Sequence, residues 1–233
     1  MARLPWPPPL LPAESTGHTV VEGRERVWRV YRAGGRHPVR WDTFRTYGLV
    51  ASGRFDHHLH PASDQPDRGI LYGALQDAAA AIAEAFQDTR TIDRAHEDPW
   101  LVGFELESDL VVLDLAGSWP TKAGASQAIA TGRRDVAQAW SRSIYAAYPE
   151  VNGLIYPSAM AGRAMNVAIY ERGAATLPTR PVLNVPLSHP GLTRPVNRIA
   201  ATYGYDLREP SSARWAGQTS DTRSRPVQTR TGA

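Results

Sequence analysis

The sequence of 233 residues contains no cysteine and a single lysine, Lys122. Without cysteine there is no disulfide framework, no thiolate zinc site and no cysteine nucleophile. No apolar run approaches the roughly 20 residues that a membrane-spanning helix needs. The proline-broken start MARLPWPPPLLPAEST lacks the pattern of a secretion signal. We therefore expect a cytoplasmic protein without a membrane segment.

The positive charge is carried almost entirely by arginine. Lysine and arginine together number 26, of which all but one are arginine, against 23 acidic residues, for a formal net charge of +3. These arginines are dispersed and no predicted helix face collects them, so we expect no direct nucleic-acid binding. Because the planar guanidinium group matches phosphate geometry, an anionic small molecule remains a candidate ligand.

The order of the predicted elements is typical of an α+β fold. Strands are predicted at 26–32, 69–74, 101–115 (two strands), 152–158 and 164–171, and helices at 75–86 and 133–148. Asp77 is placed to cap the first helix. The second helix is amphipathic, with one face formed by Val136, Trp140, Ile144 and Ala147. Because strands outnumber helices without alternating with them, we expect one domain with a mixed central sheet flanked by helices.

The chain divides into three predicted parts. Residues 1–20 are proline-rich, and we expect them to be extended or disordered. Residues 21–205 form the predicted folded domain. Residues 206–233 are rich in arginine, serine and threonine and lack apolar periodicity, so we expect a flexible tail, with Trp215 as its one candidate anchor.

The sequence HHLH, preceded by Asp56, raises the question of a zinc site. His57, His58 and His60 with Asp56 are the right residue types for zinc. However, neighbouring residues in a strand point to opposite faces, so His57 and His58 cannot easily share one ion. We therefore expect a solvated polar loop and no metal, and keep a zinc-binding module as an alternative.

Other motifs of well-known enzyme classes are absent. There is no GxxxxGK[ST] phosphate loop, no GxGxxG after a strand and no GxSxG nucleophile elbow. Ser158 follows a predicted strand, where either a nucleophile or a plain turn serine can stand. Glu84 lies among alanines on the first helix, so its carboxylate must find a donor or face a cleft. Arg54 is either a surface residue or an anion clamp.

Six short segments follow one another in an order that resembles the RES-domain family, named for its arginine, glutamate and serine. They are VWRVYR, GRFD, ILYGA, AIAEAF, DLVVLDL and GLIYPSA, and they run over residues 27–170. The resemblance implies a fold similar to that of ADP-ribosyltransferases. It also implies, as for many members, a toxin that consumes NAD with inorganic phosphate as co-substrate. The partner that it implies is a helix-turn-helix (Xre-like) antitoxin.

The resemblance assigns five site residues. Arg54 and Glu84 match the catalytic arginine and glutamate of the family's GR[FW] and A..E motifs. Arg29 matches the arginine of the first strand, Tyr72 the tyrosine of LY.A, and Ser158 the serine of the YPSA turn. The residues that it implies for binding NAD or phosphate are Arg29, Arg54, Tyr72 and Ser158. It implies no metal and no tightly bound cofactor.

The sequence departs from the family pattern at three places. SGRFD stands where many members have GGRWN, so Asp56 follows the aromatic residue. The loop between Arg54 and Tyr72 is longer than usual. Some members have a further polar active-site residue before GLIYPS, and its counterpart lies somewhere in residues 135–138.

These residue types suit cleavage of the bond between ribose and nicotinamide. Oxocarbenium character develops on the ribose, as in glycoside cleavage, and a carboxylate such as Glu84 can stabilise it. Arg29 and Arg54 can clamp phosphate oxygens, Tyr72 offers a face for the nicotinamide ring, and Ser158 can position a ribose or phosphate oxygen. The acceptor stays open between phosphate, water and a protein side chain. A non-catalytic module and a homodimer also stay open.

Overall fold

The computed structural model describes residues 4–12 and 17–210. Its strands are β1 (His18–Val21), β2 (Arg26–Arg32), β3 (Tyr47–Gly48), β4 (Ser63–Asp64), β5 (Ile70–Leu75), β6 (Thr91–Asp93), β7 (Pro99–Glu105), β8 (Leu110–Asp114), β9 (Gly153–Pro157), β10 (Met165–Tyr170), β11 (Leu183–Pro186) and β12 (Asp206–Arg208). Its α-helices are α1 (Ala78–Ala85), α2 (Trp119–Lys122), α3 (Arg134–Ala147) and α4 (Thr193–Tyr203). Short 3₁₀ helices are η1 (Pro66–Arg68), η2 (Gln127–Ile129), η3 (Glu171–Thr176) and η4 (Pro190–Leu192).

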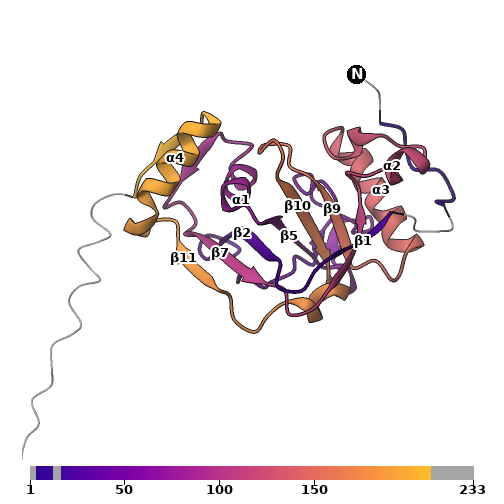
Figure 1. The fold of residues 1–233 in the computed structure, drawn as a ribbon, viewed down its shortest axis with the longest axis horizontal. Coiled ribbons are helices and arrows are strands. Elements are labelled where there is room, and N and C mark those ends of the chain that lie inside the picture. The colour runs from indigo at the N-terminus through magenta and orange to yellow at the C-terminus, as the bar shows by residue number, and fades with distance from the viewer. Residues whose placement is uncertain (1–3, 13–16, 211–233) are drawn as a thin grey trace, which may run out of the picture.

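Eight of the strands form one sheet in the order β1-β8-β9-β10-β5-β2-β7-β11. β8 and β9 run parallel, whereas the other neighbours are antiparallel. Helices α1 and α4 lie toward the β11 end of this sheet, and α2 and α3 toward the β1 end (Figure 1). The prediction of an α+β domain with a mixed central sheet is therefore confirmed.

Local sequence explains the elements that carry the site. In β2 the buried Val27 and Tyr31 alternate with residues of the opposite face, as the strand pattern predicts. Helix α1 begins after Asp77, whose Oδ1 accepts hydrogen bonds from the N–H groups of Ala79 and Ala80 at 2.8 and 3.0 Å. The predicted helix cap is therefore confirmed.

Helix α3 buries the stripe that the sequence predicts, with one exception. Val136, Trp140 and Ile144 are buried, but Ala147 is exposed and Tyr148 is buried in its place. Tyr148 is buried instead of Ala147 because the buried residues of this stripe follow one another at intervals of four positions, as on one face of a helix. This stripe packs with residues of β8, β9 and β10, whereas α1 and α4 share a separate core with β7.

Strands β2 and β5 part from each other soon after they meet. They pair only where Val27 and Trp28 face Leu75 and Ala74, although β2 pairs with β7 along its whole length. Beyond Trp28 the backbone of Arg45 takes over as the neighbour of β5, through its bridge to Ile70. The gap between β2 and β5 is where the cavity described below lies.

Both ends of the described chain are attached to the domain. Trp140 Nε1 and the Tyr148 hydroxyl of the α3 region donate to the carbonyl oxygens of Pro5 and Pro12, each at 2.8 Å. At the other end β12 pairs in parallel with β6. The three-part division of the chain stays a prediction, and Trp215 lies outside the described residues.

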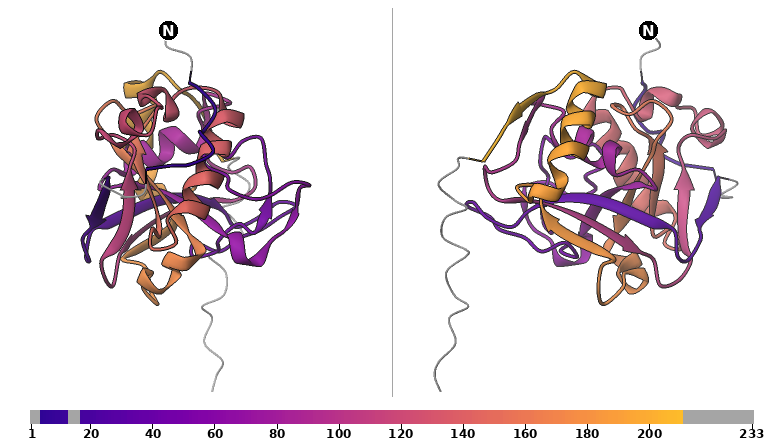
Figure 2. Two further views of the ribbon diagram at one scale, coloured as in Figure 1. Left: turned by 90° about the vertical axis from the view of Figure 1, so that its right-hand side faces the viewer. Right: turned by 60° about the vertical axis from the view of Figure 1, so that its left-hand side comes forward.

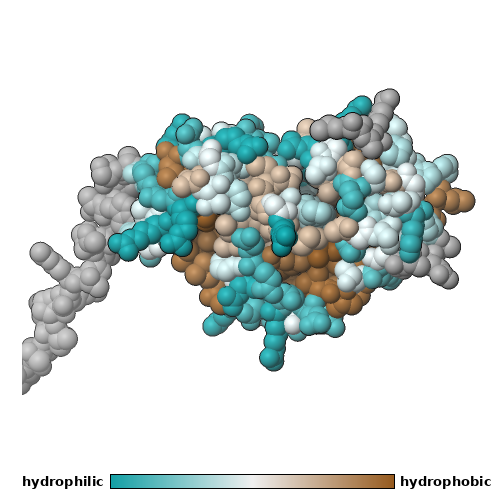
Figure 3. Space-filling view, turned by 45° about the horizontal axis from the view of Figure 1, so that its top comes forward, coloured by the Kyte–Doolittle hydropathy of each residue, from teal (hydrophilic) through white to brown (hydrophobic). Residues whose placement is uncertain are grey.

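Further views show the packing of the helices and one face of the molecule. Figure 2 shows α1 and α4 side by side, in agreement with their shared core. In Figure 3 pale and tan residues occupy the middle of the face, and brown patches below it are separated by a group of hydrophilic residues. In residues 4–12 and 17–210, no helix is both long and apolar enough to cross a membrane.

Replacing the cap of α1 should destabilise the fold. We expect Asp77→Ala to lower the free energy of unfolding by about 1 kcal/mol, because two N–H groups of the first helical turn lose their acceptor. Urea unfolding followed by circular dichroism measures this. Asp206→Ala, at an exposed aspartate of β12, is the control and should change the free energy by less than about 0.5 kcal/mol. Equal stability of Asp77→Ala and wild type would contradict the assignment of the cap.

Candidate active site

A cavity of about 280 Å³ opens in the gap between β2 and β5. Its walls come from β2, the segment 45–54, β5, α1, the segment 130–134 and the β9–β10 hairpin. The lining residues are Trp28, Arg29, Val30, Arg45, Val50, Ser52, Gly53, Arg54, Tyr72, Gly73, Ala74, Ala81, Glu84, Ala85, Gln87, Ala130, Arg134, Tyr156, Ala159 and Asn166. Four guanidinium groups and one carboxylate therefore face the same space.

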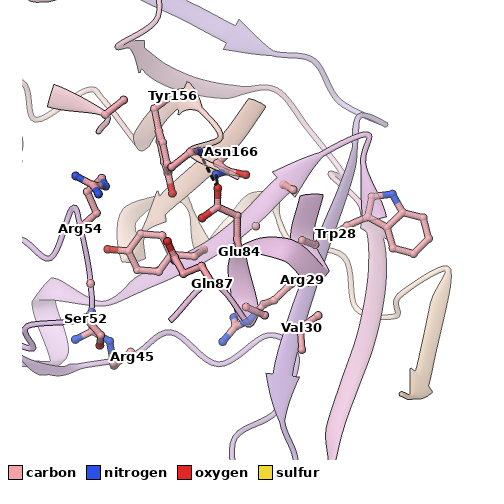
Figure 4. Close-up of a pocket in the computed structure, with 18 of the residues that line it drawn as sticks. Trp28, Arg29, Val30, Arg45, Ser52, Arg54, Glu84, Gln87, Tyr156 and Asn166 are labelled. Carbon is pink, nitrogen blue, oxygen red and sulfur yellow. Dashed lines mark hydrogen bonds between the residues drawn. The ribbon is translucent and has the colours of Figure 1, made fainter. Parts of the chain in front are cut away.

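Glu84 lies at the centre of the site, on the last turn of α1 (Figure 4). Its Oε1 accepts three hydrogen bonds, from Ser158 Oγ at 2.5 Å, Ala159 N at 3.0 Å and Asn166 Nδ2 at 2.9 Å. Its Oε2 accepts none from the described part of the chain. The carboxylate is thus fixed by one oxygen and offers the other to whatever fills the cavity.

Arg29 and Arg54 are held to the walls by backbone carbonyl groups. Arg29 Nη1 donates to the carbonyl oxygens of Trp41 and Thr43, both at 3.2 Å. Arg54 Nη1 donates to the carbonyl oxygen of Gly132 at 2.7 Å. Nη2 of either arginine donates to no group in the described chain, so both keep donors for a ligand. Burial lowers the pKa of Arg29 to about 10 and also lowers that of Arg54, and both remain protonated at neutral pH.

Two further arginines that the sequence did not single out complete this side of the cavity. Arg45 donates to Asp56 Oδ2 at 3.0 Å and to the carbonyl oxygen of Tyr47 at 2.6 Å. Arg134 pairs with Asp88 at 3.1 Å. Figure 4 shows Arg29, Arg45 and Arg54 spread around Glu84 on one side of it. Such a cluster suits a ligand with more than one negative charge.

Aromatic side chains form the apolar part of the cavity. The Tyr72 hydroxyl accepts a hydrogen bond from Phe55 N at 3.1 Å. Tyr156 packs its ring on Phe55, with centroids 4.6 Å apart, and points toward the space between Arg54 and Glu84 (Figure 4). Its hydroxyl makes no hydrogen bond to the described residues, and burial raises its pKa, so it stays a neutral donor. These rings offer stacking faces for a planar ligand group.

The structure brings four of the five predicted site residues to the cavity and places the fifth behind it. Arg29, Arg54, Tyr72 and Glu84 line the space, whereas Ser158 does not. The Ser158 hydroxyl is buried, donates to Glu84 and accepts from the N–H groups of Met160 and Ala161. In this arrangement Ser158 orients the carboxylate.

No role was predicted from the sequence for Asn166 or Tyr156, although both lie at the site. Asn166 sits in β10 and reaches Glu84 only because β10 lies beside β5 and beneath α1. Tyr156 is the first residue of the YPSA turn, but only the serine of that motif was assigned a role, because a tyrosine in a strand is usually a packing residue. A polar residue inside the apolar pattern of β10 is the one signal that could have identified Asn166.

Asp56 and Gln138 hold the turn that presents Arg54. Asp56 is fully buried, and its carboxylate accepts from Val50 N at 2.7 Å, from Arg45 and from His58. Gln138 Nε2 donates to the carbonyl oxygens of Val50 and Gly53 at 2.8 and 2.7 Å. Of residues 135–138, Gln138 therefore holds the backbone of the turn that precedes Arg54, whereas Asp135 is exposed.

The expectation of a solvated histidine loop is wrong for two of the three histidines. His57 and His58 are fully buried, and only His60 is exposed. His57 stacks on Tyr145 with ring centroids 4.3 Å apart, and burial lowers its pKa. His58 Nδ1 bonds to Asp56. This part of the loop is buried because the rings of Tyr145 and Tyr170 pack against His57. Within the described ranges no three His, Asp or Glu residues are grouped so as to hold a metal ion.

The sequence matches the family model described as RES domain over residues 26–188, which include all five predicted site residues. Among solved structures, the chain is similar to one described as the crystal structure of the M. tuberculosis MbcT-MbcA toxin-antitoxin complex. The two share 18% sequence identity with a TM-score of 0.49, over 77% of this chain and 92% of that chain. The comparison with curated proteins finds no match.

Removing one guanidinium group should weaken anion binding at the cavity. We expect Arg54→Met to bind inorganic pyrophosphate about tenfold or more weakly than wild type, because a charge-assisted hydrogen bond is lost. Isothermal titration calorimetry at fixed salt measures the dissociation constant. The control is Arg40→Met, since the Arg40 side chain is 78% exposed and lies outside the cavity. Pyrophosphate binding that is equal in all three proteins would contradict an anion site here.

Asp56 should make the fold acid-sensitive. Burial alone would raise its pKa, but the bonds from His58, Val50 N–H and Arg45 outweigh burial and hold the pKa at about 2, below the usual 3.8. Because the folded-state pKa is the lower one, this stabilisation is complete above about pH 4 and is lost as the pH falls toward 2. A shift of this size is worth about 2 kcal/mol.

Asp56→Asn should therefore lower the free energy of unfolding by about 2 kcal/mol at pH 7 and make it less dependent on pH between 5 and 3. Urea unfolding at pH 7, 5 and 3 measures both effects. A variant that stays as stable as wild type at pH 7, with an unchanged pH dependence, would show that the carboxylate is not stabilised by its partners.

Proposed function

The chain belongs to the RES-domain family, and from this we propose that it is a toxin enzyme that degrades NAD. The reaction that we propose is cleavage of the nicotinamide–ribose bond with inorganic phosphate as acceptor. The single observation that carries the proposal is the fixed carboxylate of Glu84, whose Oε2 is left for a ligand in a cavity lined by four arginines.

The charges of the cavity match two phosphate-bearing ligands better than one. Four guanidinium groups face a single carboxylate, and Asp56 and Asp88 neutralise only two of them in part, from outside the lining. The pyrophosphate of NAD brings two negative charges, and inorganic phosphate brings one or two more. This surplus of positive charge supports phosphorolysis over hydrolysis, because water would need no further cation.

The proposed step follows from the position of the Glu84 carboxylate. As the bond from ribose C1 to the nicotinamide nitrogen breaks, its electron pair goes to the nitrogen and neutralises the pyridinium ring. The positive charge that develops on the ribose is stabilised by Glu84, whose Oε2 also accepts from a ribose hydroxyl. A phosphate oxygen then forms the new bond to C1, which gives nicotinamide and ADP-ribose 1''-phosphate.

The remaining lining residues bind and orient the two reactants. The arginines hold the pyrophosphate and the attacking phosphate, so that both reactants are oriented before the bond breaks. Tyr72 presents its ring to the nicotinamide or the adenine. The Tyr156 hydroxyl, which has no partner in the described residues, donates to a ligand oxygen between Arg54 and Glu84. No step of this scheme needs a resident cofactor.

The proposal includes a protein partner. A chain that consumes NAD needs an inhibitor in the cell that makes it, and the RES family implies a helix-turn-helix (Xre-like) antitoxin for this role. Because the cavity is open and positively charged, an inhibitor segment with acidic or aromatic side chains suits it.

Glu84→Gln should abolish most of the NAD turnover while leaving the fold intact. The amide oxygen can still accept from Ser158, Ala159 N and Asn166, so only the charge is lost. We expect kcat to fall about 100-fold or more, as for loss of one group that stabilises transition-state charge. Phosphorus NMR of NAD with and without inorganic phosphate measures the reaction and its product. Glu22→Gln, at an exposed glutamate outside the cavity, is the control.

The same spectra separate the acceptors. A new phosphomonoester resonance that requires phosphate identifies phosphorolysis, and NAD loss without phosphate identifies hydrolysis. If NAD disappears only when a protein is added and ADP-ribose appears on that protein, the chain is a protein ADP-ribosyltransferase. Full NAD turnover by Glu84→Gln would overturn the role of Glu84.

A further inference from the structure

An N-terminal strap, residues 4–12, lies against α3 and outside the residues 26–188 that match the family model. It is fixed at two points, by Trp140 Nε1 donating to Pro5 O and by the Tyr148 hydroxyl donating to Pro12 O, each at 2.8 Å. The indigo trace beside α3 shows this course in Figure 1. The strap therefore lies outside the matched region and packs on a helix within it.

The strap also contributes a side chain to the core beside the cavity. Leu4 is 7% exposed and belongs to the same buried cluster as Ile129, Ala130 and Val136. It reaches Gly132 as well, since a Cβ atom on that glycine would lie 3.6 Å from Leu4 Cβ. Leu4 thus covers the connection between η2 and α3.

That connection forms the wall that positions two of the cavity arginines. The carbonyl oxygen of Gly132 accepts from Arg54 Nη1 at 2.7 Å, and Ala130 and Arg134 line the cavity themselves. The backbone here is itself held by hydrogen bonds, since Gly132 N and Thr131 N donate to the carbonyl oxygen of Ala128 at 2.5 and 3.2 Å. A shift of the 130–134 backbone would therefore move both arginines.

We infer that the N-terminal strap is a positioning element for the anion-binding side of the cavity, with Leu4 as the positioning residue. Leu4 holds the 130–134 backbone, Gly132 holds Arg54, and Arg54 contacts the ligand phosphate. For NAD turnover this inference rests on the proposed function, whereas for anion binding it does not. Loss of Leu4 should weaken ligand binding and leave the bond-breaking side at Glu84 as it is.

The test compares leucines at the two faces of the strap. Leu4→Ala removes the buried contact, Leu10→Ala changes a side chain that is 87% exposed, and Leu4→Met keeps the volume. We expect Leu4→Ala to bind inorganic pyrophosphate about tenfold more weakly, the loss expected when one charge-assisted hydrogen bond is disturbed. Leu10→Ala and Leu4→Met should bind as wild type does. Calorimetry gives the dissociation constant, and thermal unfolding gives the folded fraction.

The dissociation constant separates positioning from simple destabilisation. A smaller folded fraction lowers the number of binding sites and the apparent kcat, but leaves the dissociation constant and KM of the folded molecules unchanged. With NAD as substrate, Leu4→Ala should raise KM about tenfold with kcat within about twofold, because the lost contact serves ground state and transition state alike. Unchanged binding and KM in Leu4→Ala would overturn the inference.

A second pair of variants covers the case in which Leu4→Ala does not fold. Trp140→Phe removes the hydrogen bond at the Pro5 end, next to the cavity wall, and Tyr148→Phe removes the one at the Pro12 end. We expect weaker pyrophosphate binding in Trp140→Phe and wild-type binding in Tyr148→Phe. Equal dissociation constants for the two variants would contradict the positioning role of the strap. If wild type binds pyrophosphate but turns over no NAD, the proposed function fails while this inference is still tested.

Discussion

The three hydrogen bonds to one oxygen of Glu84 are the constraint on which the site depends. A carboxylate beside several arginines would otherwise rotate to form an ion pair with one of them and fill the cavity. Ser158, Ala159 N and Asn166 prevent this, because together they fix Oε1 by three hydrogen bonds. Helix α1 supplies the carboxylate and the β9–β10 hairpin supplies the donors, so the site exists only if helix and sheet pack in this register.

The two sides of the cavity are supported in different ways. The carboxylate side rests on α1, β9 and β10, which are regular elements with buried cores. The side of Arg45 and Arg54 rests on connections that are held by side chains bonding to backbone groups, chiefly Asp56 and Gln138. Rigid elements thus hold the group proposed to act on the breaking bond, and loops hold the groups proposed to bind anions, as in many enzymes.

Much of the fold and part of the site could be predicted from the sequence, and the reasons differ. The alternation in β2 and the alanine-rich run of α1 are local patterns. Residues adjacent in the sequence are therefore enough to predict these elements, the cap at Asp77 and the α+β class. Arg29, Arg54, Tyr72 and Glu84 could be identified because their motifs follow one another in the family order.

The remainder of the site depends on contacts between distant segments. Arg45 lines the cavity because β2 and β5 part and its backbone takes the place of β2. Asn166 meets Glu84 across 82 positions of the chain. The buried state of His57 and His58 depends on rings and carboxylates from other elements. Of these contacts, only that of Asn166 has a local sequence signal, a polar residue in an otherwise apolar strand.

The cluster of arginines itself has an energetic consequence. Burial lowers the pKa of Arg29 to about 10, which means that the protein spends stability to keep this charge in the cavity. The backbone carbonyl groups of Trp41 and Thr43 offset part of that cost without neutralising the charge, as the carbonyl group of Gly132 does for Arg54. An anionic ligand completes the compensation. Burial and the nearby charge of Arg134 likewise lower the pKa of Arg54, so both arginines have a physical reason to favour a phosphate group over water as their partner.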